Sequence, residues 1–243
     1  MANPATKKHG GQLIIALPSK GRIKDESLAV MAKAGLTVTE TGSSRGYRAE
    51  IAGLADAQVA YLSSSEIARE VGAGNAHAGI TGLDLLHEYV PAWESRVEVL
   101  RPLGFGKADV VIAVPQSWID VTGVADLESV ALSFRRAHGR RPRVATKFVN
   151  ITRRYLAEHA VTSYLVVESL GATEGTPAAG TAEVIVDITE TGATIRDNHL
   201  KVLAGDVILR SEAVLVRSKT APWSKTATAA FDEMMRRLET VKS

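Results

Sequence analysis

The sequence predicts an α/β fold with a largely parallel sheet. Short runs of β-branched and other apolar residues, typical of buried strands, alternate along the chain with longer segments whose apolar residues recur at helical spacing. Such alternation is typical of units in which helices join successive parallel strands. With 243 residues, 45% of them hydrophobic, the chain can bury the core of one large domain or of two small ones.

The alternation begins close to the start of the chain, after residues 1–11, which are expected to form a disordered arm. Strands are predicted at 12–18, 57–63 and 76–82, and each is followed by a helix, at 19–36, 63–74 and 83–90. The first helix has one apolar face, made of Ile23, Leu28, Met31 and Ala32. Two extended stretches around a pair of glycines are predicted within residues 96–115.

A second series of elements follows from residue 122. Helices are predicted at 122–139 and 150–161, and strands at 143–148, 163–171 and 183–189, with a short helix or loop at 173–182. The pattern at 200–216 is typical of paired extended segments. A last helix is predicted over 224–242, with an apolar stripe that indicates core packing, made of Phe231, Met234, Met235 and Leu238.

The composition excludes several classes of function. The chain has no cysteine, hence no disulfide framework or cysteine nucleophile, and its six histidines show no metal-ligand spacing, so no protein-held metal is expected. The net charge of +2 does not imply binding to nucleic acid, and the basic cluster at 135–143, without interleaved aromatic residues, is interpreted as a solvated loop rather than a nucleic-acid site. No segment has the length of a membrane span or of a signal-peptide core, so we expect a cytoplasmic protein without membrane contact.

The stretch EVIVDITETGAT, residues 183–194, joins a buried strand to a turn that holds carboxylates and hydroxyls. Turn N–H groups and threonine hydroxyls suit a phosphate monoester. Asp187 and Glu190 would repel a phosphate, so accepting hydrogen bonds from a ribose hydroxyl pair is the role we assign to them. The stretch therefore indicates a sugar-phosphate site; the alternative is a capped strand-to-helix turn without a ligand.

Cationic side chains follow two of the predicted strands. Lys20 and Arg22 come after the first strand in ALPSKGR, and Lys147 ends another strand in RVATKF. In open α/β sheets ligands bind at the carboxyl ends of the strands, where such cations can hold phosphates. Arg45 and Arg48 in SSRGYR add two further cations, although a plain loop explains them equally well.

Together these stretches resemble ATP phosphoribosyltransferase, the first enzyme of histidine biosynthesis, in its short form. The family's strand-Asp-T-G-x-T pattern is present at 183–194, and its other motifs correspond to ALPSKGR, RVATKF, GNAHAGITGLD and EGTPAAGTAE. They occur in order over about residues 13–217. The sequence departs from the family at Glu183, where Asp is usual, at Leu83, often Lys, and at His199, often Gly.

The resemblance implies a two-domain fold of the periplasmic-binding-protein type II kind, with mostly parallel sheets and a cleft between the domains. Domain I would comprise residues 12–105 plus 207–243, and domain II residues 106–206. The implied reaction transfers the phosphoribosyl group of phosphoribosyl pyrophosphate (PRPP) to N1 of ATP and releases pyrophosphate. Mg²⁺ would be held mainly by substrate phosphates.

The resemblance also implies roles for individual residues. The catalytic set is expected to be Lys20, Arg22 and Arg45, with Lys147 and Arg48 binding ATP or phosphate. The PRPP-binding set is expected to be Glu174, Asp187, Glu190, Thr191, Gly192, Ala193 and Thr194.

Partners follow from the same resemblance. The chain ends soon after LRSEAVLV, which leaves no room for the histidine-binding domain of the long form. We therefore expect a homodimer that joins a regulatory subunit related to histidyl-tRNA synthetase in a hetero-octamer. The alternative is a non-catalytic two-domain binding or sensor protein for a phosphorylated small molecule.

Overall fold

The computed structural model describes residues 11–40 and 48–240. The chain divides into two compact units: unit 1 comprises Met1–Gly106 and Glu212–Ser243, and unit 2 comprises Lys107–Ser211. The boundary that we expected after residue 206 falls inside a strand that continues to Ser211, so the division comes five residues later. The expected arm lies outside the described residues except for Gly11, whose carbonyl accepts a hydrogen bond from Ser224 Oγ at 2.5 Å.

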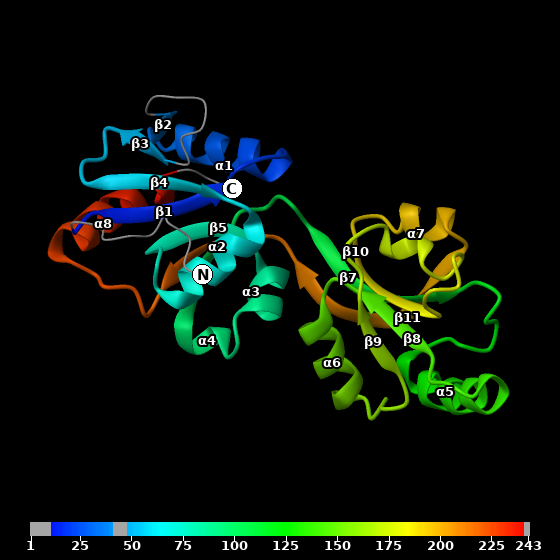
Figure 1. Cartoon of the computed structure of the whole chain (residues 1–243). Helices are drawn as coiled ribbons and strands as arrows, with labels where there is room; N and C mark the ends of the chain where they lie inside the picture. Colours follow the sequence, from blue (N-terminus) through cyan, green and yellow to red (C-terminus); the bar gives the residue numbers. More distant parts are fainter. Residues whose placement is uncertain (1–10, 41–47, 241–243) are drawn as a thin grey trace. The chain divides into compact units, whose positions relative to one another are not determined.

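Unit 1 is built on a seven-stranded sheet in the order β2-β3-β4-β1-β5-β12-β6 (Figure 1). Its strands are β1 Leu13–Pro18, β2 Thr37–Glu40, β3 Arg48–Ala52, β4 Ala57–Leu62, β5 Ala78–Gly82, β6 Val97–Pro102 and β12 Ala213–Ser218. Its helices are α1 Arg22–Lys33, α2 Ser64–Ala73, α3 Leu83–Tyr89, α4 Trp93–Arg96 and α8 Lys225–Glu239.

Helices cover both faces of this sheet, as the alternation of side chains along β1 shows. Leu13, Ile15 and Leu17 pack in a core with residues of α1 and α8, such as Met31 and Met234. The intervening residues, Ile14 and Ala16, pack in a second core with α2 and α3. Because successive side chains of a strand point to opposite faces, a strand buried on both sides is apolar throughout, as the sequence predicts for β1.

The apolar face predicted for α1 faces the core except at Ala32. Met31 is buried, Ile23 and Leu28 are partly buried and pack against the same core, and Ala32 is exposed. The second fully buried residue of the helix is Ser27. The Ser27 hydroxyl donates to the carbonyl of Ile23 at 2.6 Å, so its polar atom is satisfied inside the helix.

Unit 2 is built on a five-stranded sheet in the order β11-β7-β10-β8-β9 (Figure 1). Its strands are β7 Ala108–Pro115, β8 Arg143–Thr146, β9 Leu165–Glu168, β10 Val184–Thr189 and β11 Leu200–Ser211. The helices are α5 Val124–His138, α6 Val149–Glu158 and α7 Ala193–Asp197, with a 3-10 turn, η2, at Thr173–Gly175. One core joins α5 and α6 to one face of the sheet, and a smaller core joins Ile195 of α7 to the other face.

Both sheets are mixed, so the prediction of mostly parallel sheets is wrong. Parallel pairing joins β1 to β4 and β5 in unit 1, and β8 to β9 and β10 in unit 2. The remaining pairs are antiparallel. Parallel neighbours need a long crossover between them, whereas β3 and β4, separated by a short link, pair antiparallel.

Residues 200–216 also pair differently from our prediction. They form two strands, as expected, but β11 pairs with β7 and β12 pairs with β5 and β6. The strands belong to different sheets, so they do not pair with each other. None of the described helices has the length and apolar character needed to cross a lipid bilayer.

Candidate functional site

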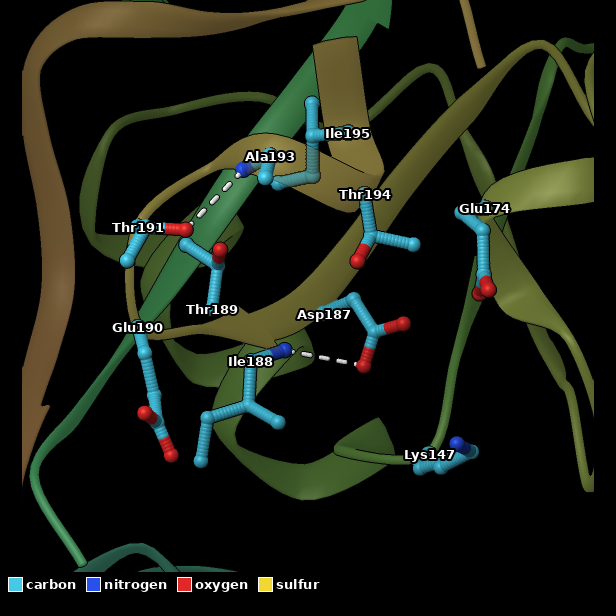
Figure 2. Close-up of a pocket in the computed structure, with 10 residues that line it drawn as sticks. All are labelled: Lys147, Glu174, Asp187, Ile188, Thr189, Glu190, Thr191, Ala193, Thr194 and Ile195. Carbon is cyan, nitrogen blue, oxygen red and sulfur yellow. Dashed lines mark hydrogen bonds between the residues drawn. The ribbon is translucent and has the colours of Figure 1, made fainter. Parts of the chain in front are cut away.

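A pocket of about 380 Å³ lies in unit 2, where β10 runs through a turn into α7 (Figure 2). Because β8 and β10 are parallel neighbours, their carboxyl ends meet at one edge of the sheet and bring Lys147 beside the β10 turn. The pocket is lined by Lys147, Glu174, Asp187, Ile188, Thr189, Glu190, Thr191, Ala193, Thr194 and Ile195. The structure thus gathers six of the seven residues of the predicted PRPP set, with Lys147, at one place.

The turn itself is built around Gly192, the remaining member of that set. Gly192 has a positive φ of 71°, a conformation that favours glycine. Its N–H donates to Thr189 Oγ1 at 2.8 Å, and the N–H of Ala193 donates to Thr191 Oγ1 at 3.3 Å. The N–H groups of Gly192 and Ala193 are therefore already bonded to threonine hydroxyls. An anion would either displace these hydroxyls from the two N–H groups, or accept hydrogen bonds from the hydroxyl groups of Thr189, Thr191 and Thr194.

Arg196 braces the same turn from α7. Its Nη1 donates to the carbonyl of Thr191 at 3.0 Å. A Cβ atom placed on Gly192 would lie 2.9 Å from that nitrogen, so a side chain at this position would displace the guanidinium. Arg196 was not among the predicted site residues. The signal for it in the sequence is weak, because a single arginine in a short helix does not reveal that it folds back on the turn.

Asp187 is the buried acid of the pocket, with only 9% of its surface exposed. Burial raises the pKa of its carboxyl group, and the negative charge of Glu174 acts in the same direction. The Ile188 N–H, which donates to Asp187 Oδ1 at 2.8 Å, and the positive charge of Lys147 act against the rise in pKa. The carboxylate is thus partly desolvated and ready to gain from a further hydrogen-bond donor.

The acidic side chains of the pocket differ in the direction in which they point. Figure 2 shows the Asp187 carboxylate pointing into the space bordered by Thr194, Glu174 and Lys147, whereas the side chain of Glu190 points away from it. Among the described residues, neither Lys147 nor Glu174 has a hydrogen-bond or ion-pair partner. Two carboxylates and one ammonium group can thus reach a ligand, which suits a molecule carrying both hydroxyls and a phosphate.

The other predicted cations are placed elsewhere or not described. Lys20 follows β1, and Arg22 is the first residue of α1, where its Nε lies 3.9 Å from Glu26 Oε2, so both belong to unit 1. Arg45 lies outside the described residues. Arg48 opens β3, and its side chain is likewise outside the described part of the chain.

Two departures from the family pattern have a structural explanation. Glu183 accepts hydrogen bonds from both terminal nitrogens of Arg140, at 2.7 and 3.1 Å, and from the N–H of Arg143 at 2.7 Å, so it ties the basic cluster to the start of β10. These bonds lower the pKa of Glu183 against the effect of its burial, which is the largest contribution and raises the pKa. The interpretation of the basic cluster as one loop is wrong, because Arg135, Arg136 and His138 belong to the last turn of α5 and Arg143 begins β8. His199 has a φ of 55°, which explains why glycine suits this position in the family. Leu83 begins α3 and packs against an apolar core of unit 1.

Comparisons with known proteins point in one direction. The family model described as ATP phosphoribosyltransferase matches residues 63–240. A protein of that name from Mesorhizobium japonicum is 53% identical over 210 residues, which cover 86% of this chain and 90% of that protein. Another, from Rhodopseudomonas palustris (strain BisB18), is 53% identical over 214 residues, and the match covers 88% of this chain and 66% of the length of that relative.

Solved structures show the same fold. An ATP phosphoribosyl transferase (HisG:HisZ) complex from Thermotoga maritima has a TM-score of 0.70 at 24% identity, covering 95% of this chain and 100% of that one. The substrate-binding protein of an amino acid ABC transporter has a TM-score of 0.51 at 11% identity, covering 94% and 92% of the two chains. The predicted fold, of the periplasmic-binding-protein type, is thereby confirmed.

Proposed function

The chain belongs to the ATP phosphoribosyltransferase family, and on that premise we propose that the pocket at the end of β10 binds PRPP. The enzyme transfers the phosphoribosyl group of PRPP to N1 of ATP, which gives N1-(5-phosphoribosyl)-ATP and pyrophosphate, the first step of histidine biosynthesis. The observation that carries the proposal is the buried Asp187, which shares one pocket with Lys147, Glu174 and a hydroxyl-rich turn.

In this pocket the carboxylates take the ribose and the turn takes the phosphate. Asp187 and Glu174 accept hydrogen bonds from the 2′- and 3′-hydroxyls. The 5′-phosphate is bound by hydroxyls and amides of the turn from Glu190 to Thr194. Lys147 neutralises negative charge beside them, a role that its lack of a partner among the described residues supports.

The chemistry requires orientation and charge stabilisation rather than a protein nucleophile. The lone pair of N1 of ATP forms a bond to C1 of the ribose, and the bond from C1 to the pyrophosphate oxygen breaks with its electron pair going to the leaving group. Holding the two substrates in line lowers the entropic cost of this step, and cations stabilise the departing charge. We assign the latter role to Lys20, Arg22 and Arg45.

The donor set fits Mg²⁺ that is held mainly by substrate phosphates. Asp187 and Glu174 face the ribose and are only two carboxylates, and within the described residues no group of three or more acidic or histidine side chains could hold a metal ion. When bound with PRPP, Mg²⁺ supplies positive charge that favours departure of pyrophosphate.

We further propose that the protein acts in the cytoplasm as a homodimer, joined by a regulatory subunit related to histidyl-tRNA synthetase in a hetero-octamer. The support for such a partner is the HisG:HisZ complex of T. maritima, which contains an ATP phosphoribosyl transferase of the same fold. Adding the partner is expected to raise activity and to confer inhibition by histidine, which requires the partner to have different affinities for two states of the assembly.

The test is pyrophosphate release from ATP and PRPP in the presence of Mg²⁺, with the partner subunit present or omitted. Release that requires both substrates, with a product in which ribose is attached to N1 of ATP, would support the proposal. Binding of PRPP without release under either condition would leave a non-catalytic binding protein as the better description.

A further inference from the structure

Lys147 and Glu174 are the two charged side chains that face Asp187 across the pocket. Lys147 and Glu174 have no hydrogen-bond or ion-pair partner among the described residues, so their positions depend on the backbone that carries them. Each directly follows a threonine with 0% exposure, Thr146 before Lys147 and Thr173 before Glu174. A buried hydroxyl must find hydrogen-bond partners, and those partners show how the two backbone segments are fixed.

The Thr146 hydroxyl closes the turn that carries Lys147. Its Oγ1 accepts the N–H of Phe148 at 2.9 Å, which bridges the backbone on both sides of Lys147. The Thr152 hydroxyl of α6 lies 3.5 Å from the same oxygen. A side-chain-to-backbone bond of this kind sets the local direction of the chain, and hence the direction in which Lys147 leaves it.

Ser169, one residue beyond the end of β9, connects this turn to the one that carries Glu174. Its N–H donates to the carbonyl of Thr146 at 2.9 Å. Its Oγ accepts the hydroxyl of Thr173, the first residue of η2, at 3.1 Å. The Thr173 hydroxyl also lies 3.2 Å from the carbonyl of Gly171, so its single proton is shared between the two acceptors.

We propose that Ser169 is a positioning residue for the transferase reaction, acting through Glu174. Its Oγ accepts the Thr173 hydroxyl and so fixes the turn that carries Glu174 opposite Asp187, while its backbone N–H anchors Ser169 itself to the carbonyl of Thr146. Ser169 does not line the pocket. The inference rests on the proposed PRPP site, because the placement of the Glu174 carboxylate matters only if that carboxylate contacts PRPP.

The test combines single substitutions with a background that lacks the carboxylate. Ser169→Ala is expected to raise the KM for PRPP by about three- to tenfold, the range for loss of one neutral hydrogen bond, and to leave the KM for ATP unchanged. Thr173→Val should have the same effect, whereas Thr173→Ser, which keeps the hydroxyl, should restore wild-type values. In the Glu174→Gln background, Ser169→Ala should raise the KM for PRPP by less than about twofold further, because coupled residues are not additive.

Ser163→Ala is the matched control. Ser163 lies just before β9, and its hydroxyl donates to Glu128 Oε1 at 2.5 Å, away from the residues that line the pocket. Its loss should leave the KM for PRPP at the wild-type value, and the melting temperature of every variant shows whether an effect reflects unfolding.

The outcomes separate the positioning role from the proposed function. An impaired Glu174→Gln variant beside a wild-type-like Ser169→Ala variant would overturn the positioning role alone. Full multiplication of the two effects in the double variant would also overturn it, because independent effects indicate general structural damage. Wild-type kinetics of Glu174→Gln would overturn the proposed role of Glu174 in the pocket, and the positioning role with it.

Discussion

Replacing Asp187 with asparagine removes the charge of the buried acid with little change in side-chain size. Asp187 has 9% of its surface exposed, and its Oδ1 already accepts the N–H of Ile188 at 2.8 Å. The second oxygen, Oδ2, has no hydrogen-bond partner among the residues that the structure describes, so it is the one available to a ribose hydroxyl. The substitution therefore removes one charge-assisted hydrogen bond to the ligand rather than two.

The expected loss in kcat/KM follows from the loss of this one hydrogen bond. A hydrogen bond to a charged group contributes about 1.5–3 kcal/mol. At about 1.4 kcal/mol for each factor of ten, the kcat/KM for PRPP should fall by roughly 10- to 150-fold. We expect a higher KM for PRPP and a lower kcat, with the KM for ATP close to the wild-type value.

The assay is steady-state release of pyrophosphate with PRPP varied at saturating ATP. Glu190→Gln is the matched control, because it removes one carboxylate of the same turn whose side chain points away from Asp187 in Figure 2. Its effect should be several times smaller than that of Asp187→Asn. Wild-type kinetics for Asp187→Asn, or equal losses in the two variants, would refute the assignment of Asp187 to the ribose.

Three further predictions concern the same pocket. Asp187→Asn should increase the free energy of unfolding at neutral pH, because burial raises the pKa of Asp187 and ionisation of this buried carboxyl destabilises the native state. Urea titrations should show that this gain in stability disappears as the pH falls below 3.8, where Asp187 is protonated in the unfolded chain as well as in the native state. Lys147→Met, which keeps most of the apolar stem, should raise the KM for PRPP about tenfold and weaken its dependence on salt, and an unchanged salt dependence would contradict a phosphate contact. Arg196→Met should raise the KM for PRPP severalfold, because it removes the hydrogen bond from Arg196 to the carbonyl of Thr191. A wild-type affinity for PRPP, measured by fluorescence or calorimetry, would contradict the role of Arg196 in supporting the turn.

Features encoded in neighbouring residues could be predicted from the sequence alone. Continuous apolar runs located β1 and β10, and the turn after β10 was recognised from its glycine, threonines and carboxylates. These features are local, because strand burial and turn chemistry depend on residues only a few positions apart. The antiparallel pair of β2 and β3 was missed, since these strands are short and lie at one side of the sheet, where no long apolar run is required.

Features that depend on pairing between distant segments were decided only by the tertiary structure. Strand order made both sheets mixed and brought Lys147, Glu174 and Asp187 from three separate segments of the chain into one pocket. The raised pKa of Asp187 and the bonds of Ser169 depend on the same packing, and neither residue type predicts them alone. The physical reason is that burial, charge proximity and hydrogen-bond partners are properties of the folded neighbourhood, which the order of residues in a strand or turn does not specify.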